Sequence, residues 1–466
     1  MKVVKFGGSS LATGNNVDKA LKIIKDDPER KVIVVSAPGK RNDDDIKVTD
    51  LLITYAYASL RSNNYDDIAN KIFKRYELIA QYFNLPEKEL SEIKRLLLTL
   101  PQLDYPNADY RMAAFKAHGE RLNAMLITKI LNHQGIKTRF LEPKDVGLIV
   151  TGTPNNAEVN PETYVNLKRI KLNKDERIIF PGFYGITPSA HIATFSRGGS
   201  DITGAILARG FNADLYENFT DVDAIFSANP NIIDHPKPIK KMTYQEMREL
   251  SYAGFSVFHD EALIPAIQGE IPVNVKNTNA PEKPGTLIVP EEGFTAKKTI
   301  TGIAGGKNFA ALYLRKYMLN KGAGFTLKLM EIFNRHHVSY EHMPSGIDDL
   351  TVIFKKDALN DQLIDVICNE IQTSLNPDQM QWIDDYAITM VVGEGMKDKL
   401  TLCASLLYPL GKKDISIQMI NQGASQISIM IGTRRKDEEA VIKTIYENFI
   451  ADIQLHNHDY VIVYQL

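Results

Sequence analysis

K-V-V-K-F-G-G-S-S, residues 2–10, is the stretch that decides the fold, because an apolar strand runs directly into two glycines and two serines. Gly7 and Gly8 have no Cβ atom, so their backbone N–H groups can approach an anion closely. Lys5 places a positive charge beside them. The stretch predicts a phosphate-binding loop, with a glycine-rich turn and a solvated lysine as an equal alternative. The chain contains neither G-x-x-x-x-G-K-[ST] nor G-x-G-x-x-G.

Length and composition exclude several classes of protein. At 466 residues the chain has room for two or three domains. A formal net charge of −2 gives no sign of a surface for nucleic acid or for a membrane. Cys368 and Cys403 form no C-x-x-C pair, so neither a disulfide framework nor a structural zinc site is expected. Because no signal peptide and no apolar segment of about 18 residues is present, we expect a cytoplasmic protein.

Strands alternate with amphipathic helices over the first part of the chain. The expected strands are Val3–Phe6, Lys31–Ser36, Lys137–Phe140, Ile178–Pro181, Asp214–Glu217 and Val273–Asn277. The expected helices include Tyr65–Phe83 and Asp109–Asn132. This alternation predicts an α/β fold, a mainly parallel sheet sandwiched by helices, with ligands beyond the carboxyl ends of the strands. Pro and Gly punctuate residues 279–293, which indicates a closing strand and a linker.

The last third of the chain contains an internal repeat with an offset of 77 residues. The matching positions are Phe325, Leu329, Phe333, Val338, Gly346 and Val352 in the first copy, and Leu402, Leu406, Leu410, Ile415, Gly423 and Ile429 in the second. Each copy is expected to run strand, helix, strand, hairpin turn, strand, helix, strand. The repeat therefore predicts a duplicated small α+β unit.

A second glycine-rich loop opens a helix at F-S-R-G-G-S-D, residues 195–201. Arg197 beside Gly198 and Gly199 forms a fork that fits a carboxylate or a phosphate, with backbone donors next to it. The alternative is that Ser200 and Asp201 only cap and begin the helix. We favour an anion site.

Four further polar residues are candidates for a site. Thr220 and Asp221 end an apolar strand, where they could hold a nucleotide or a hydrated Mg²⁺, and an Asx turn is the equal alternative. Glu120 follows Gly119 inside a helix, where a glycine suggests close approach of another group, although a solvated glutamate is the more ordinary explanation. Thr49 follows a polar loop at 39–47 that we expect to be mobile, and a helix N-cap is its ordinary explanation.

Together these stretches resemble the aspartate kinases of the amino acid kinase family. The resemblance spans nearly the whole chain and rests on seven segments in the family's order: K-F-G-G-S-S from residue 5, V-V-S-A-P-G-K-R from 34 with V-T-D from 48, H-G-E-R from 118, S-R-G-G-S-D from 196, T-D-V-D from 220, V-V-G-E-G-M from 391 and I-N-Q-G-A-S from 420. It implies the amino acid kinase fold at 1–293, followed by two ferredoxin-like ACT domains at 300–378 and 384–466.

The resemblance implies ATP-dependent phosphorylation of the β-carboxylate of L-aspartate to 4-phospho-L-aspartate, the first step of lysine, threonine and methionine biosynthesis. The implied catalytic residues are Lys5 and Asp221. The residues implied for ATP, which arrives with Mg²⁺, are Lys5, Phe6, Gly7, Gly8, Ser9, Thr220, Asp221 and Phe226. Those implied for aspartate are Thr49, Glu120, Arg197, Gly198, Gly199, Ser200 and Asp201, with Glu120 at the ammonium and Arg197 at the α-carboxylate. A carboxylate with a pKa of about 3.9 is already an ionised nucleophile, so no general base is required.

Residues 256–261 depart from the family's pattern. Many relatives read K-V-L-H-P where this chain has S-V-F-H-D at 256–260, so the lysine often assigned to ATP is missing and Glu261 follows. Other common residues of the family are replaced by Ala224, Phe226, Asn229 and Asn231. The departures predict a weaker or differently placed nucleotide site in an enzyme that is still active.

The paired ACT domains imply control by an amino acid, with lysine as the expected inhibitor and threonine as the second choice. The expected effector loop is Met318–Phe325. Its candidate contacts are Met318, Lys321, Gly322, Gly324 and Phe325, together with Glu341 for an ammonium group. The two glycines could instead only turn the chain into its helix. Because ACT sheets pair edge to edge, a homodimer or a higher assembly is expected.

Two other functions stay open. A non-catalytic amino-acid sensor with a degenerate kinase fold is suggested by the missing lysine near residue 256. Another amino acid kinase, acting on glutamate or acetylglutamate, is the other alternative, although such relatives usually lack two ACT units. Some relatives are fused to homoserine dehydrogenase, and since no dinucleotide fingerprint occurs here, a monofunctional enzyme is expected.

Overall fold

The computed structural model describes residues 1–61, 65–173, 175–196, 198–252, 254 and 260–451, which form two compact units. The first comprises Met1–Ile225, Pro238–Met247 and Ser256–Phe294, and the second Phe226–Lys237, Arg248–Phe255 and Thr295–Leu466. The second unit thus includes two short segments from inside the range expected for the kinase domain, 1–293. The boundaries of the two ACT domains stay predictions.

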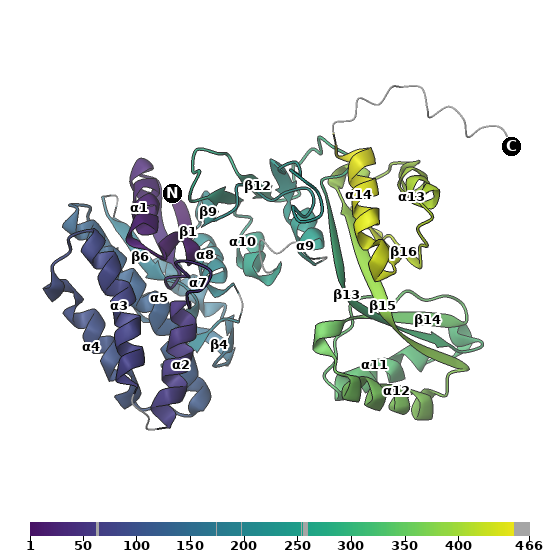
Figure 1. Ribbon diagram of the computed structural model, residues 1–466, viewed down its shortest axis with the longest axis horizontal. Helices are drawn as coiled ribbons and strands as arrows, with labels where there is room; N and C mark the ends of the chain where they lie inside the picture. The colour runs from purple at the N-terminus through teal and green to yellow at the C-terminus, as the bar shows by residue number, and fades with distance from the viewer. Residues whose placement is uncertain (62–64, 174, 197, 253, 255–259, 452–466) are drawn as a thin grey trace. The chain divides into compact units, whose positions relative to one another are not determined.

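The first unit is built on an eight-stranded sheet with the order β10-β12-β11-β9-β1-β2-β6-β3 (Figure 1). Its strands are β1 (Lys2–Phe6), β2 (Arg30–Val35), β3 (Thr138–Phe140), β6 (Arg177–Pro181), β9 (Leu215–Thr220), β10 (Lys241–Thr243), β11 (Val273–Asn277) and β12 (Thr286–Val289). Only the β11–β12 pair is antiparallel among these neighbours. The predicted mainly parallel α/β sheet is therefore confirmed. Two small hairpins escape the sequence analysis: β4 (Val150–Thr153) with β5 (Asn156–Val159), and β7 (Tyr184–Ile186) with β8 (Ile192–Thr194).

Helices cover this sheet. They are α1 (Gly14–Asp26), α2 (Val48–Leu60), α3 (Asp66–Tyr82), α4 (Ser91–Thr99), α5 (Ala108–His133), α6 (Pro143–Val146), α7 (Glu162–Arg169), α8 (Gly199–Gly210), α9 (Tyr244–Tyr252) and α10 (Ile264–Gln268). Val4 and Phe6 belong to the core that α1, α2, α3 and α5 form on one face. Lys5 lies between them in the strand, so its side chain points to the other face, where it contacts α8. In the described part of the chain no helix combines the length and apolar character needed to span a bilayer.

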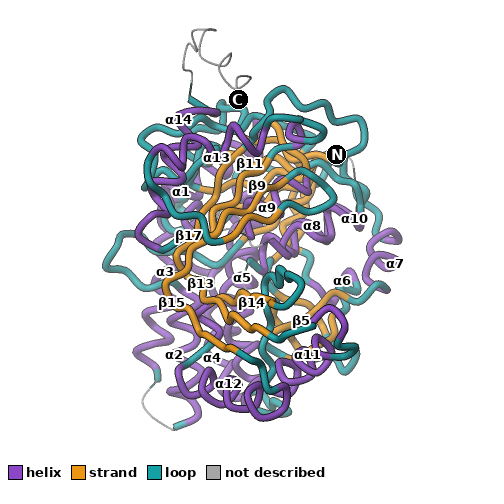
Figure 2. The backbone as a smooth tube through the Cα atoms, turned by 90° about the vertical axis from the view of Figure 1, so that its right-hand side faces the viewer, coloured by secondary structure: helices purple, strands orange, loops and turns teal. Residues whose placement is uncertain are grey.

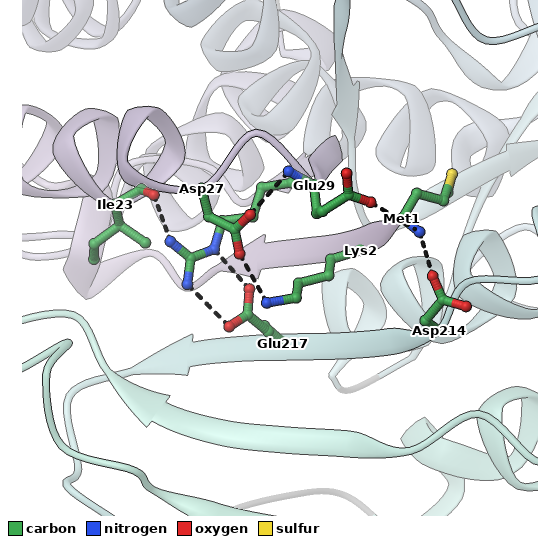
Figure 3. Close-up of polar contacts among 8 residues, drawn as sticks. Met1, Lys2, Ile23, Asp27, Glu29, Asp214 and Glu217 are labelled. Carbon is green, nitrogen blue, oxygen red and sulfur yellow. Dashed lines mark hydrogen bonds and ion pairs between the residues drawn. The ribbon is translucent and has the colours of Figure 1, made fainter. Parts of the chain in front are cut away.

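Ion pairs fix the amino ends of the central strands (Figure 3). The amino group of Met1 contacts Asp214, which directly precedes β9. Within the sheet, Glu217 is almost fully buried, and both of its carboxylate oxygens accept from Arg30, at 2.7 and 3.0 Å. Arg30 also donates to the carbonyl of Ile23 in α1 at 2.6 Å. These charged groups are paired with one another within the fold. They therefore have a structural role at the amino ends of the strands.

The second unit contains one antiparallel sheet with the order β14-β13-β15-β17-β16. Its strands are β13 (Gly302–Arg315), β14 (Asp349–Lys355), β15 (Gln379–Val392), β16 (Met419–Asn421) and β17 (Ser428–Thr433). Its helices are α11 (Phe325–Arg335), α12 (Asp361–Leu375), α13 (Leu402–Lys412) and α14 (Glu438–Phe449). The strands β13 and β15, with 14 residues each, run through both halves of the unit (Figures 1 and 2).

The two repeat copies share these long strands instead of forming separate sheets, which corrects the predicted strand order. Leu312 and Leu314 in the second half of β13 pack with α11 and α12, whereas Ile303 in its first half packs with α13 and α14. The strand expected near Val338 forms only isolated bridges, such as His342 to Ile353. The last strand expected in the second copy would fall at 452–466, outside the described residues.

Candidate active site

Three central strands bring distant segments together at their carboxyl ends. In the parallel sheet Phe6 of β1 lies in register with Phe219 of β9 on one side and with Val35 of β2 on the other. Gly7 and Thr220 therefore leave the sheet side by side, and the N–H of Gly7 donates to the carbonyl of Phe219 at 3.2 Å. The carboxyl edge of such a sheet is where ligands of open α/β proteins bind.

Lys5 and Asp201, two of the predicted site residues, meet at this edge. The side chain of Lys5 is buried, and its Nζ lies 2.7 Å from Asp201 Oδ1 at the start of α8. Asn218 of β9 donates to the same oxygen. A Cβ atom on Gly7 would stand 3.6 Å from Lys5 Nζ, so the glycine keeps space beside the ammonium. The N–H of Gly7 itself is already in use, so its predicted role as a donor is not available in this structure.

The two glycine-rich segments of the edge are packed backbone on backbone. Gly39 donates its N–H to the carbonyl of Gly8 at 2.9 Å, and a Cβ on Gly39 would lie 2.6 Å from the carbonyl carbon of Gly8. The turn that follows (Ser9–Leu11) is tied to the end of β11, because Ser10 Oγ lies 2.6 Å from Thr278 Oγ1. The N–H of Thr278 donates to Thr220 at 2.9 Å. The phosphate-loop candidate is thus held from both sides.

Glu120 is a buried carboxylate with unused hydrogen-bonding capacity. It is 5% exposed, it accepts from the backbone N–H of Ala37, and its Oε2 has no partner among the described residues. Burial raises the pKa of Glu120 to about 8. The more ordinary explanation, a solvated glutamate, is wrong because Glu120 is buried, and the alternative of a close approach at Gly119 is confirmed, since a Cβ there would lie 2.8 Å from the Cβ of Ala37. A buried, incompletely paired carboxylate next to a glycine loop is suited to receive a cationic group.

The remaining predicted substrate residues lie around the same edge. Gly198 adopts a φ of 65° as the N-cap of α8, so Ser200 and Asp201 fall in its first turn and neither is the cap. Ser200 packs against Gly182 at the end of β6, where a Cβ would stand 2.5 Å from its Oγ. Thr49 is the second residue of α2, and its expected role as the N-cap is wrong because Lys47 holds that position. The neighbour of Thr49, Val48, donates to Pro38 in the Ala37 segment at 3.2 Å.

The nucleotide-side residues are only partly placed. Asp221 is exposed, and Thr220 Oγ1 lies 3.2 Å from its carboxylate. Ser9 is exposed in the turn after Gly8. Phe226 is half-buried and belongs to the second unit. Arg197 and residues 256–259 lie outside the described residues. Within the described ranges, no group of three or more His, Cys, Asp or Glu side chains is placed to hold a metal ion.

Sequence reasoning missed two residues of this edge, and each carried a signal. Asn218 is a polar residue in the middle of a buried strand, where an unmatched amide is costly. Phe183 follows Gly182 at the end of β6 with a φ of 79°, packs against Gly199, and has Lys116 Nζ 5.6 Å from its ring centre. A bulky residue in the left-handed region is costly, so its occurrence at this strand end is a reason to count Phe183 among the candidates.

The predicted effector residues do not all meet within one chain. Met318 is exposed and donates its N–H to Asp348 Oδ1 at 2.7 Å, and Gly324, with a φ of 89°, is the N-cap of α11. The expected turning role of Gly324 is therefore confirmed. Glu341 donates its N–H to Ile353 at 2.7 Å, whereas the loop follows Arg315, which pairs with Asp349 at the other end of β14. The glutamate and the loop thus lie toward opposite ends of that strand.

Known proteins resemble this chain over nearly its full length. The model of the amino acid kinase family matches residues 1–277, and an ACT domain model matches residues 390–449. Aspartokinase 3 of Bacillus subtilis is 45% identical over 453 residues, which is 97% of this chain and 99% of that relative. The crystal structure of Clostridium acetobutylicum aspartate kinase is 36% identical with a TM-score of 0.84, covering 96% of this chain and all of the other.

More distant structures share the fold. Those of E. coli aspartokinase III, one in complex with aspartate and ADP and one with lysine and aspartate, are 21% and 22% identical. Their TM-scores are 0.76 and 0.77, they cover 96% and 97% of this chain, and this chain covers 99% and 100% of them.

Proposed function

The chain belongs to the aspartokinases of the amino acid kinase family and is an aspartate kinase, and we propose that it transfers the γ-phosphoryl group of ATP to the β-carboxylate of L-aspartate at the carboxyl edge of the eight-stranded sheet. The observation that supports this placement is the pair of contacts made by the segment 36–39. This segment contacts Gly8 through Gly39 and Glu120 through Ala37. A phosphate loop and a buried carboxylate that can receive an ammonium group therefore lie on two sides of one short segment.

Lys5 is the cation of the transfer step. Phosphoryl transfer requires alignment and neutralisation of the negative charge that spreads over the transferring group. Without ligand the ammonium of Lys5 is held by Asp201, which in turn also accepts from Asn218. When phosphates enter, the amide of Asn218 continues to bind Asp201 while Lys5 turns its charge to the nucleotide. Mg²⁺ arrives with ATP. Thr220 and Asp221, at the end of β9, would bind the Mg²⁺–ATP complex through their side-chain oxygens.

Aspartate binds between α5 and the start of α8. The free Oε2 of Glu120 receives the ammonium, Arg197 receives the α-carboxylate, and Gly198, Gly199, Ser200 and Thr49 line the pocket. The β-carboxylate needs no general base because it is ionised at neutral pH. The effect of the missing lysine near residue 256, the role of Phe226 and the cytoplasmic location stay predictions.

Regulation by an amino acid, with lysine first and threonine second, is proposed at the loop Met318–Phe325. Large apolar side chains are exposed around this loop: Tyr317, Met318, Leu327 and Ile347. Such a patch is suited to a second copy of the chain, which supports a homodimer. Since Glu341 lies away from the loop in its own chain, the glutamate that completes the site would come from the other copy.

A coupled assay of ADP release tests the proposal. Turnover with aspartate and none with glutamate is expected. Replacing Arg197 by Ala removes a charge-assisted pair worth about 2–3 kcal/mol, so the KM for aspartate should rise roughly 30- to 150-fold. Arg209→Ala is the matched control, because Arg209 lies in the last turn of α8, at the opposite end of this helix from Ser200 and Asp201, and donates to Gln268 at 2.6 Å. Turnover with glutamate would select the other amino acid kinases. Aspartate binding without any ADP release would select a sensor.

A further inference from the structure

We infer that Arg75 of α3 is a positioning residue for the active site: its guanidinium holds both ends of the loop at residues 39–46, and this loop sets the contact between the two glycine-rich segments. The inference rests on the proposed function, because the loop matters for catalysis only if phosphates and aspartate bind at this edge.

The guanidinium of Arg75 contacts the loop at three points. The side chain is 4% exposed, Nη1 donates to the carbonyl of Ile46 at 2.9 Å, and Nη2 donates to the carbonyl of Gly39. Nη1 also lies 3.0 Å from Asp45 Oδ2. Nε has no partner among the described residues, so every polar contact described for this guanidinium goes to the loop. The sequence predicts a mobile loop here, and in the structure one planar group bonds to both of its ends.

Asp45 compensates the charge of Arg75 from inside the loop. Its carboxylate also accepts from the backbone N–H and from Nε of Arg41, at 2.9 and 2.8 Å. The hydrogen bonds from Arg41 and the charge of Arg75 hold the pKa of Asp45 well below its usual range. Burial lowers the pKa of Arg75, and the charge of Asp45 opposes this effect. Asp45 and Arg75 therefore form a charged pair, and Arg41 of the loop also contacts the Asp45 carboxylate.

The segment that Arg75 holds is the one that reaches the substrates. Gly39, whose carbonyl accepts from Arg75, donates its N–H to Gly8 at 2.9 Å. Its neighbour Pro38 accepts from Val48 at the start of α2, next to Thr49. Ala37 donates to Glu120. A shift of the loop would thus move the phosphate side and the aspartate side together.

The space beside Arg75 is not filled by side chains. A cavity of about 260 Å³ borders Arg75 and is also lined by Arg41, Leu78 and Tyr82. Truncating Arg75 would enlarge this space, and Arg41 of the loop already borders it. The carbonyls of Gly39 and Ile46 would lose their partner, which favours a displaced loop.

The experiment compares Arg75→Ala and Arg75→Lys with Arg111→Ala in the ADP-release assay and in thermal unfolding. Arg111 is the matched control, since it is half-buried, donates to Ser59 Oγ at 2.7 Å and to Pro101 at 3.4 Å, and lies over two aromatic rings. Arg75→Ala should raise the KM for aspartate at least about tenfold and lower kcat. Arg75→Lys should restore little, because an ammonium cannot span two carbonyls as a planar fork does.

Added guanidinium chloride, kept below its denaturing range, should restore the KM of Arg75→Ala and leave Arg111→Ala unchanged. Arg111→Ala should lower the Tm while keeping both kinetic constants. The inference is overturned if the wild type is active and Arg75→Ala keeps its KM for aspartate, or if both alanine variants lose only Tm and active fraction. A wild-type chain that releases no ADP with aspartate would overturn the proposed function and this inference with it. Arg75→Lys keeps the charge and most of the volume, so it decides the question if Arg75→Ala does not fold.

Discussion

Each unit of the chain has glycine-rich loops that follow strands. In the first unit Gly8 and Gly39 are tightly packed, whereas in the second Gly322 and Gly324 have free space around them. In the first unit a Cβ on Gly39 would lie 2.6 Å from the backbone of Gly8, and a Cβ on Gly8 would lie 3.0 Å from Ala37 O. In the second unit nothing lies within 4 Å of the Cβ position of Gly324, and the nearest atom to that of Gly322 is 3.6 Å away. The loops that we propose for catalysis are thus fixed by backbone contact, whereas the loop that we propose for the effector has free space at its glycines.

The two repeat copies of the second unit also differ in how tightly their glycine loops are packed. In the loop after β15, side chains on Gly393 and Gly395 would collide with the backbone of residues 298–300. That loop faces a cavity of about 490 Å³ lined by residues that include Asp398, Lys399, Gln422 and Gln426. The loop after β13 has no such packing at Gly324. The two copies thus differ in the space beside their loops, which is open at Gly324 in the first and a lined cavity in the second.

The largest expected effect is that of Lys5→Met. Removing a preorganised cation from the transferring phosphates should lower kcat by about 10²- to 10³-fold. Asp201 keeps its hydrogen bond from Asn218, so the fold around it should persist. Lys2→Met is the matched control, because Lys2 lies on the same strand but pairs with Asp27 at the amino end. Equal activity of the two variants in the ADP-release assay would show that Lys5 does not face the phosphates.

Gly39→Ala tests the preorganisation of the catalytic loops. The added methyl group has no room, and overpacking of this kind costs about 1–3 kcal/mol. If this strain displaces the loop, kcat/KM should fall by roughly 10- to 100-fold. Gly322→Ala is the control in the open loop, because Gly322 has a φ of −78° and space at its Cβ position. A Gly39→Ala variant as active as Gly322→Ala would contradict the contrast between the two loops.

The sequence predicts the local features of this site better than their connections. Periodicity predicts α3 and α5 to within a residue or two, and the glycine before Glu120 indicates the close approach that Ala37 confirms. Arg75 also carries a signal, since it shares the apolar face of α3 with Ile72 and Tyr76, where a charge requires partners. Those partners are loop carbonyls some 30 residues away, which no local pattern identifies.

In the second unit, too, the sequence predicts local features but not the contacts between distant segments. The repeat correctly pairs the apolar positions of α11 with those of α13, because helix periodicity is local. It does not indicate that β13 and β15 each run through both halves. The length of a strand in a sheet depends on how far its neighbours extend, and here those neighbours come from both copies.

The aspartate KM should depend on pH through Glu120. Burial raises the pKa of this group to about 8, so below that pH the empty site holds a proton that the substrate ammonium must displace. Coupling to one proton predicts that the KM falls about tenfold per unit as pH rises from 6 towards 8 and then levels off. Glu120→Gln should have a higher KM that is nearly independent of pH. A wild-type KM that is flat over this range would show that the carboxylate does not receive the ammonium.

The same group should affect stability with the opposite trend. Its pKa is raised in the folded state from an ordinary value of 4.5, so its contribution to the free energy of unfolding is fully present below about pH 4.5 and is lost as pH rises through about 8. In the absence of aspartate, Glu120→Gln should remove this part of the pH dependence, as measured by denaturant unfolding. A variant whose stability falls with pH as steeply as that of the wild type would assign the loss to other groups.

The smallest expected effect concerns the open loop. Glu341 is partly exposed and lies 3.8 Å from Lys355 Nζ, so its pairing with a lysine ammonium should be worth at most about 1 kcal/mol, or roughly fivefold. Glu341→Gln should therefore weaken inhibition by lysine a few-fold with kcat unchanged. Gln422→Ala, at the cavity beside the packed loop, should leave lysine inhibition as it is. The reverse result, with inhibition weakened only by Gln422→Ala, would move the effector to the second copy, and the open glycines would then belong to the contact between chains.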